Sequence, residues 1–397
     1  MRRIILPLLA LLAGGLSAHA ADQTVLQHGE YLTRAADCAA CHSAPGREAW
    51  TGGREFSLPF GVLYSQNITP DRETGIGLYT DDEWVEMLHH GIGRGGKHLY
   101  PAMPYNSYTQ MSRDDALAIK AYLFSLPPVH STVQPNRMNF PFNQRWLMIG
   151  WNLLNNPDHR FQPADGRSAA WNRGAYLVEA LGHCAQCHTP RNVMQGLSDR
   201  QFAGAAQQGW VAYNLTSDKE HGIGAWSDDQ LVQYLHEGRA PGHGPASGPM
   251  AEAVQDSLRY LTDEDLHAMV TYLRDVPARP DGPAANPVSL LQDDAASDAL
   301  GAKIFAQACA GCHLQNGTGR QSPWAALGGD HSLGDPSGRN VVQILEHGSE
   351  LQTEQGLMFM HGFGGAYTTE ELAALSNYVI RHFSGRTGTV TAQQFVR

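Results

Sequence analysis

Apolar residues recur at helical spacing in three pairs of segments along the chain. The first member of each pair begins with glycine and is followed by large apolar residues, at 29–32, 174–177 and 301–305. The second member starts with acidic residues, which complement the dipole of a helix N-terminus, and continues with an apolar face, at 114–123, 263–273 and 370–379. Pro127-Pro128 and Pro277 end the first two of these later segments. The pattern therefore predicts three helical units in sequence.

The first two units share further stretches that the third one lacks. Asn-Ile-Thr-Pro at 67–70 corresponds to Asn-Leu-Thr-Ser at 214–217, and a Gly-Ile-Gly sequence occurs at 75–77 and again at 222–224. Thr80 and Ser227 follow these glycines, and each has an acid or amide three residues later, which predicts a capped helix start. The third unit keeps only the Leu-Glu-His-Gly at 345–348, so we expect it to be smaller.

The chemistry of the chain is concentrated in a pentapeptide that occurs three times, once in each unit. The copies are Cys-Ala-Ala-Cys-His at 38–42, Cys-Ala-Gln-Cys-His at 184–188 and Cys-Ala-Gly-Cys-His at 309–313. Two thiols one helical turn apart can each bond a vinyl group of a porphyrin, and the adjoining His can ligate its iron. We therefore predict three covalent haem c groups, bound by Cys38, Cys41, Cys184, Cys187, Cys309 and Cys312, with His42, His188 and His313 as proximal ligands. A redox disulfide or a zinc site is the alternative, but no cysteine remains for a second zinc ligand pair.

Each haem iron then needs a sixth ligand, for which methionine is the expected residue in an electron-transfer site. In the first unit, Met103 lies between prolines in Tyr-Pro-Ala-Met-Pro-Tyr, 61 residues after His42, and it is favoured over Met87 and Met111. In the second, Met250 follows Gly248-Pro249 at 62 residues from His188, and it is favoured over Met194 and Met269. In the third, Met360 is favoured, with Met358 and His361 as alternatives in the same stretch.

The N-terminus and the linkers define the remaining organisation of the 397 residues. Arg2 and Arg3, the apolar run 4–16 and Ala18-His19-Ala20 predict a signal peptide at 1–20, and hence export. No later segment is apolar for long enough to span a bilayer, and a net charge of −11 argues against nucleic acid as a partner. Linkers are predicted at 129–167 and 278–296, and a polar tail at 386–397. The first linker carries Phe-Pro-Phe at 140–142 and an apolar run at 146–154. We expect it to fold as a strap against its own haem domains; the alternative is a surface for a partner, lipid or quinone.

These features together predict an all-α fold. We expect three tandem cytochrome-c-like domains at 21–128, 168–277 and 297–385, each consisting of a few helices around one haem.

The haem motifs, the paired Asn-[Ile/Leu]-Thr and Gly-Ile-Gly stretches and the sequence around Met103 resemble one known family. It comprises the tri-haem cytochrome c subunits of bacterial membrane-bound dehydrogenases, which serve quinoprotein alcohol dehydrogenases, flavin-dependent sugar and sugar-acid dehydrogenases, and molybdenum hydroxylases. The resemblance implies that a dehydrogenase catalytic subunit oxidises the substrate and that the haems pass electrons singly to ubiquinone or another respiratory acceptor. It implies no catalytic residues in this chain, a periplasmic location at the inner membrane, and membrane association through the complex. It also matches Met103, Met250 and Met360 to the distal ligands.

Two other functions remain open at this stage. A multihaem enzyme such as a peroxidase would need one iron with an exchangeable sixth position. A diffusible periplasmic electron carrier would have no fixed dehydrogenase partner.

Overall fold

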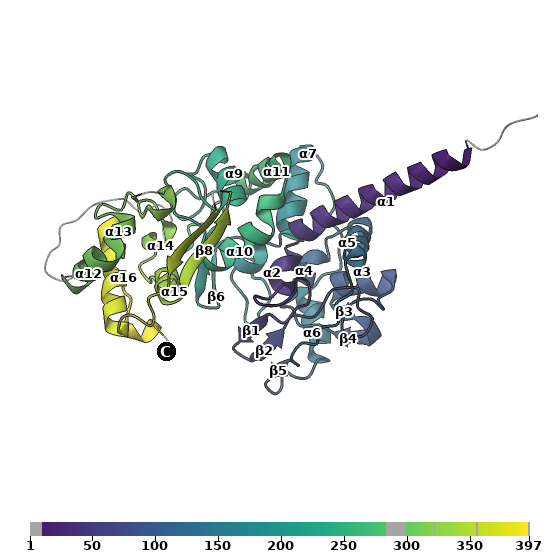
Figure 1. The fold of residues 1–397 in the computed structure, drawn as a ribbon, viewed down its shortest axis with the longest axis horizontal. Helices are drawn as coiled ribbons and strands as arrows, with labels where there is room; N and C mark the ends of the chain where they lie inside the picture. The colour runs from purple at the N-terminus through teal and green to yellow at the C-terminus, as the bar shows by residue number, and fades with distance from the viewer. Residues whose placement is uncertain (1–9, 283–298, 321, 355, 396–397) are drawn as a thin grey trace, which may run out of the picture. The chain divides into compact units, whose positions relative to one another are not determined.

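A computed structural model describes residues 10–282, 299–320, 322–354 and 356–395 (Figure 1). The predicted linker 278–296 lies for the most part outside the described residues, as do the first nine residues of the predicted signal peptide and the last two of the polar tail. The chain divides into two compact units, residues 1–161 and 162–397, so the first haem motif belongs to one unit and the other two to the second. Within the described ranges, no helix has the combination of length and hydropathy that crossing a membrane requires.

Unit 1 contains six α-helices and five short strands among its described residues. The helices are α1 (Ala10–Ala35), α2 (Cys38–His42), α3 (Asp81–His90), α4 (Tyr105–Tyr108), α5 (Arg113–Ser125) and α6 (Leu147–Asn155). The strands are β1 (Glu55–Leu58), β2 (Gly61–Tyr64), β3 (Ile92–Gly93), β4 (Lys97–His98) and β5 (Arg137–Met138), and a 3-10 turn, η1 (Arg94–Gly96), joins β3 to β4. They form an antiparallel sheet in the order β1-β2-β5 and a separate β3-β4 pair.

Unit 2 contains the remaining elements. Its α-helices are α7 (Ala169–Ala175), α8 (Ala185–His188), α9 (Asp228–Glu237), α10 (Gly248–Asp256), α11 (Asp263–Arg274), α12 (Ala299–Ile304), α13 (Ala310–His313), α14 (His331–Gly334), α15 (Arg339–His347) and α16 (Thr369–Ser384). Two π-helical turns, η2 (Tyr176–Leu181) and η4 (Phe305–Cys309), and three 3-10 turns, η3 (Leu258–Tyr260), η5 (Pro323–Ala325) and η6 (Ala392–Gln394), complete the helical part. The strands β6 (Ala205–Gln207) and β7 (Trp210–Ala212) pair antiparallel, as do β8 (Gly348–Thr353) and β9 (Gly356–His361).

The prediction of an all-α fold made of three tandem cytochrome-c-like domains is wrong. The described residues include nine strands arranged in four small antiparallel sheets. Most of these strands are two to four residues long, which is too short for the alternation of apolar and polar residues to be recognised. They form where glycine-rich turns reverse the chain, as at Gly61 and Gly356, whose φ angles of 139° and 113° favour glycine.

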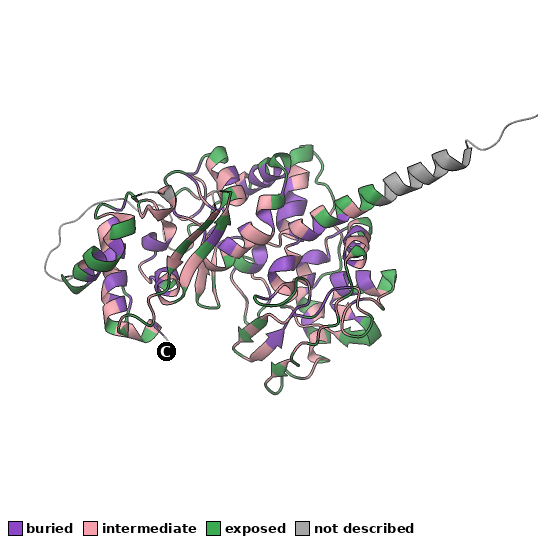
Figure 2. Cartoon of the chain, in the orientation of Figure 1, coloured by how far each residue is buried: buried purple, intermediate pink, exposed green. Residues whose placement is uncertain are grey.

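An early and a late helix pack on each other around each of the three motifs. Helix α1 packs on α5, α7 on α11, and α12 on α16. A glycine stands at each crossing: a Cβ atom built on Gly29, Gly174 or Gly301 would lie 2.0, 1.9 or 2.4 Å from a backbone carbonyl oxygen of the partner helix. Leu32 in α1, Leu177 in η2 directly after α7 and Leu372 in α16 are buried, and Figure 2 shows buried residues along α7, α11 and α16. The glycines that begin each helical pattern therefore set a close helix–helix approach.

The stretches shared by the first two motif regions brace the loops that follow each motif. The Asn67 and Asn214 side chains donate hydrogen bonds to the carbonyl oxygens of Val129 and Arg279, both at 2.8 Å, just beyond the ends of α5 and α11. The predicted caps at Thr80 and Ser227 are also confirmed, because each forms a reciprocal capping box with the residue three positions later.

Candidate functional site

Each Cys-x-x-Cys-His sequence lies on a short helical turn that follows the early helix of its pair. The first occupies α2; the second begins at Cys184 and continues as α8; the third begins at Cys309 and continues as α13. In the second and third, the preceding turn is π-helical. Such turns insert one extra residue per turn and are frequent at functional sites.

The imidazole of each motif histidine is held by a backbone carbonyl. His42 Nδ1 lies 2.6 Å from the Gln66 carbonyl oxygen, His188 Nδ1 lies 2.6 Å from that of Tyr213, and His313 Nδ1 lies 2.7 Å from that of Ala325. A carbonyl can only accept, so Nδ1 carries the proton in each ring and Nε2 keeps its lone pair. This hydrogen bond fixes the tautomer and the orientation that a metal-ligating histidine needs.

Burial keeps the same three imidazoles neutral. Desolvation lowers the pKa of His42, His188 and His313, and the hydrogen bond to the carbonyl offsets this lowering only in part. A neutral imidazole is the form that binds iron, because protonation would remove the lone pair of Nε2.

The first cysteine of two motifs has the pKa of a desolvated thiol, whereas Cys187 and Cys312 are exposed. Burial raises the pKa of Cys38 to about 12 and that of Cys309 to about 11. A redox-active Cys-x-x-Cys pair needs a lowered pKa instead, and none of the six cysteines, all within the described ranges, is in a disulfide. Among the described residues, no three or more His, Cys, Asp and Glu side chains converge as a metal site, so the zinc alternative has no ligand set. Thiols and a neutral imidazole on one turn match the donors that covalent haem requires.

The predicted distal residue of unit 1 lies in a short turn. Met103 donates its backbone N–H to the Tyr100 carbonyl, and its own carbonyl accepts from Tyr105 N at 2.8 Å, directly before α4. The side chain is half-buried. Its rivals Met87 and Met111 are buried in the protein core instead, which agrees with packing roles.

The predicted distal residue of the second motif lies in the first turn of α10. Met250 follows Gly248, whose positive φ of 53° begins the helix, and Pro249, which suits a first helical turn. The side chain is half-buried. Met269 is fully buried within α11, whereas Met194 is exposed beside the motif.

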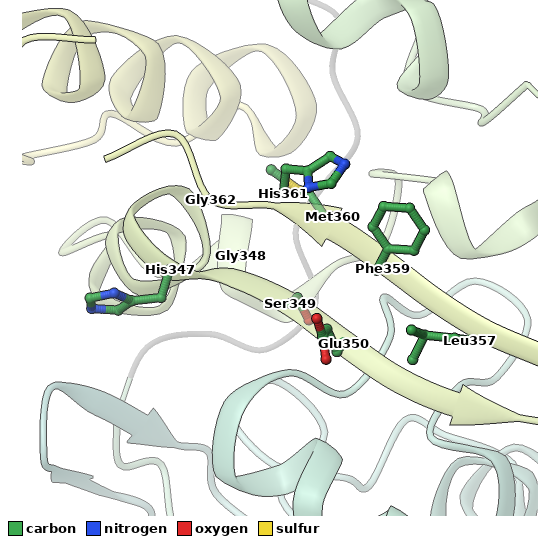
Figure 3. Close-up of a pocket in the computed structure, with 9 residues that line it drawn as sticks. All are labelled: His347, Gly348, Ser349, Glu350, Leu357, Phe359, Met360, His361 and Gly362. Atoms are coloured by element: carbon green, nitrogen blue, oxygen red, sulfur yellow. The ribbon is translucent and has the colours of Figure 1, made fainter. Parts of the chain in front are cut away.

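The third candidate lies on the β8–β9 hairpin (Figure 3). Met358 and Met360 are both half-buried on one face of β9, and Leu357, Phe359 and His361 are exposed on the other. Met360 packs against the buried cluster that contains Cys309 and Phe305. The hairpin thus brings Met360 to the core beside the third motif, whereas the His361 ring contacts the exposed Phe359, 4.9 Å between ring centres (Figure 3).

Some features of these sites leave no mark in the sequence. The residues directly before the first cysteine of two motifs, Asp37 and His183, adopt left-handed backbone conformations with φ of 52° and 39°. The Arg54 guanidinium donates to the Ala40 carbonyl at 2.7 Å, and the Gln207 amide donates to that of Gln186 at 2.5 Å, so each supports a motif turn. Long-range contacts between side chain and backbone are invisible to local pattern analysis.

One buried donor without a partner is consistent with a bound carboxylate. The indole Nε1 of Trp226 is buried and has no protein acceptor among the described residues. Trp226 follows the second Gly-Ile-Gly stretch, directly before the cap of α9. Haem carries two propionates, so its carboxylates fit this unpaired donor.

Comparison with known proteins identifies the relationship. The family model for cytochrome c matches residues 299–381, a single segment around the third motif, which also counts against three recognisable tandem domains. The gluconate 2-dehydrogenase cytochrome c subunit of Pantoea cypripedii is 36% identical, across 97% of this chain and 93% of that protein. The chain belongs to the family of dehydrogenase cytochrome c subunits.

Other members of this dehydrogenase cytochrome c family extend the relationship. The fructose dehydrogenase cytochrome subunit of Gluconobacter japonicus is 35% identical, across 94% of this chain and 82% of that protein. A nicotinate dehydrogenase subunit of Pseudomonas putida is 38% identical over 91% of this chain, but the chain spans only 30% of the length of that protein. The predicted resemblance to dehydrogenase cytochrome c subunits is thus confirmed.

Proposed function

We propose that this chain binds three haem c groups and passes electrons, one at a time, from a dehydrogenase catalytic subunit to ubiquinone or another respiratory acceptor. One observation carries the proposal: each of the three Cys-x-x-Cys-His turns has its imidazole Nδ1 bonded to a backbone carbonyl at 2.6–2.7 Å. A redox disulfide has no use for a histidine held in this way. Three repetitions of the same arrangement support three haem sites.

The chain's residues would attach the porphyrins covalently and ligate the irons. Covalent haem supplies a reversible one-electron couple when bound. Cys38, Cys41, Cys184, Cys187, Cys309 and Cys312 would hold the porphyrins; His42, His188 and His313 would be proximal ligands, and Met103, Met250 and Met360 distal ligands. Burial and nearby charge would tune the potential of each site. For a one-electron couple, a difference of about 59 mV between neighbouring sites shifts electron occupancy tenfold.

The relatives support the choice of donor. The gluconate, fructose and alcohol dehydrogenase relatives are named as cytochrome subunits of those enzymes. We infer a dehydrogenase as the partner here, with substrate oxidation on that subunit and none on this chain. We further infer export by a signal peptide at 1–20, haem-bearing segments at 21–128, 168–277 and 297–385, and a location at the periplasmic face of the inner membrane.

Haem stoichiometry and ligand replacement test the proposal. The purified protein should carry three covalent haems per chain, all low-spin. Each of the variants Met103→Ala, Met250→Ala and Met360→Ala should convert one third of the haem to a different ligation state and lower one midpoint potential, because thioether ligation raises the potential. Optical spectra and a redox titration of each variant measure both effects.

Matched replacements at the third site serve as controls. Met358→Leu and His361→Ala should leave the spectrum and the potentials unchanged, because Met358 shares the face but not the proposed role and His361 lies on the exposed face. Rapid carbon monoxide binding to one haem of the reduced wild-type protein would contradict the relay and favour a multihaem enzyme. Purification without any dehydrogenase subunit would favour a diffusible carrier.

A further inference from the structure

The part of the predicted first linker that belongs to unit 1, residues 129–161, exposes apolar side chains that were expected to be buried. Six large apolar residues on it are exposed, and we call them the strap patch: Phe140, Phe142, Trp146, Ile149, Leu153 and Leu154. Leu153 is 85% exposed and Phe140 is 80% exposed, whereas Trp151 alone in α6 is buried, at 7%. The predicted strap does contact its own unit, but these six apolar side chains are not buried by it.

Helix α6 is docked firmly on unit 1, so the exposure follows from its orientation. Trp151 packs edge-on against Tyr105, with ring centres 6.0 Å apart. The Asn152 amide donates to the His90 carbonyl at 2.8 Å and accepts from the Tyr105 hydroxyl at 2.8 Å. The Asn156 amide donates to the His89 carbonyl at 3.0 Å. These contacts use one side of the helix.

The opposite side of α6 and its N-cap residue carry part of the strap patch. Trp146, Ile149 and Leu153 are separated by three and four residues, so they form one stripe along the helix. The turn before α6 is fixed beside it, because the Phe142 ring packs on Phe60 at 4.9 Å and the Phe142 carbonyl accepts from the Tyr100 hydroxyl at 2.8 Å. A stable backbone therefore presents these apolar side chains to the outside.

The charges around the strap patch are basic in an acidic protein. Residues 129–161 contain three arginines, Arg137, Arg145 and Arg160, against the single acid Asp158, whereas the whole chain has a net charge of −11. Arg160 pairs with Asp158 at 2.9 Å, and Arg137 lies 4.0 Å from Glu55 outside this segment. Arg145 is tied to unit 1 through the His98 carbonyl at 2.6 Å. Between 138 and 156 the remaining polar side chains are uncharged amides.

We propose that the strap patch inserts into the interface of an anionic lipid bilayer and attaches this chain to the membrane directly. Trp and Phe prefer the headgroup region, aliphatic side chains enter the acyl boundary, and arginines pair with anionic lipid. Side chains that protrude as far as Leu153 and Phe140 suit a deformable lipid surface. The inference does not depend on the number of haems.

Vesicle sedimentation of the haem-loaded protein tests this inference. The wild-type protein should co-sediment with vesicles of phosphatidylcholine and phosphatidylglycerol, and more weakly with phosphatidylcholine alone. The triple variant Trp146→Asn, Ile149→Asn, Leu153→Asn should bind the anionic vesicles at least about tenfold more weakly, because three large apolar side chains no longer leave water. Its haem spectrum and melting temperature should match those of the wild-type protein.

A control pair and a fallback variant keep the test decisive. Val193→Asn and Leu300→Asn replace exposed apolar residues elsewhere and should bind vesicles like the wild type. If the triple variant does not fold, Leu153→Asn alone should still weaken binding. Failure of the wild-type protein to bind either vesicle would overturn the inference. So would a triple variant that binds vesicles normally but loses its dehydrogenase subunit, since the strap patch would then be a protein interface.

Discussion

Two histidines outside the haem motifs lie in a buried ring cluster of unit 2. His243 stacks on Trp226, with ring centres 3.4 Å apart, and His331 meets the same indole edge-on at 5.3 Å. Burial, with a smaller contribution from the charge of His243, lowers the pKa of His331 from 6.5 to about 3, and burial lowers that of His243 to about 4. His331 Nε2 has no hydrogen-bond partner among the described residues. Both rings are therefore neutral in the folded protein at neutral pH.

This neutrality makes the stability of unit 2 sensitive to acid. Between pH 6.5 and about 3 the unfolded chain binds protons at these histidines and the folded chain does not, so stability falls as the pH falls through this range. Replacing His331 with Phe should keep the edge-on ring contact and make the pH dependence shallower, by up to about 1.4 kcal/mol per pH unit.

Denaturant titrations of the protein at several pH values measure this slope. The comparison of variant with wild type cancels the contribution of the neighbouring buried Asp330. Equal slopes for His331→Phe and the wild type would show that His331 takes up its proton in the folded state.

At the scale of helices, two glycines of unit 1 should respond differently to replacement by alanine. Gly29 in α1 and Gly150 in α6 both belong to unit 1. A Cβ on Gly29 would lie 2.0 Å from the Ala118 carbonyl oxygen, whereas a Cβ on Gly150 would have no atom within 4 Å. Alanine is the better helix former, so the two positions should respond with opposite signs.

Gly29→Ala should destabilise unit 1 by about 1–3 kcal/mol, the usual cost of forcing atoms into a packed contact. Gly150→Ala should stabilise it by about 0.5–1 kcal/mol through backbone entropy alone. Thermal unfolding of the haem-loaded variants measures both changes. A destabilising Gly150→Ala, or a neutral Gly29→Ala, would contradict the packing described for α1 and α6.

Some features of the helices and strands could be predicted from the sequence and others could not. The capped starts at Thr80 and Ser227 follow from residue types at fixed local spacing and were predictable. The packing of each early helix on a late one is a long-range contact, which local spacing does not give. The hairpin that brings Met360 to the Cys309 cluster is set by pairing between β8 and β9 across a turn. The residue types around Met360 do not identify the strand with which β9 pairs. The carbonyls that orient the three motif histidines were unpredictable, because every residue has a carbonyl.

For the strap patch, the sequence predicted burial where the structure shows exposure. An apolar run is usually buried, so 146–154 was expected to pack inward. In the structure Asn152 and the C-cap residue Asn156 make the docking hydrogen bonds, and Ile149, Leu153 and Leu154 of α6 are exposed. Composition alone cannot show which side of a short helix meets the protein.

For the whole molecule, the division into two compact units has a direct consequence. Residues 1–161 hold one Cys-x-x-Cys-His turn and residues 162–397 hold two. Separate expression of the two pieces, each with an added signal sequence, should give soluble products with one and two covalent haems. Haem content by pyridine haemochrome and the melting temperature of each piece measure this. A piece that is degraded or lacks haem would show that the units depend on one another for folding.

The carbonyl that orients His313 lies only 12 residues along the chain, at Ala325, whereas those for His42 and His188 lie 24 and 25 residues away. Halving a loop reduces the entropic cost of closing it by about 0.6 kcal/mol. The third imidazole is thus held by the contact of lowest sequence separation among the three. As the newly made chain collapses, the last of the three Cys-x-x-Cys-His turns should acquire an oriented histidine first, even though it is the last to be synthesised.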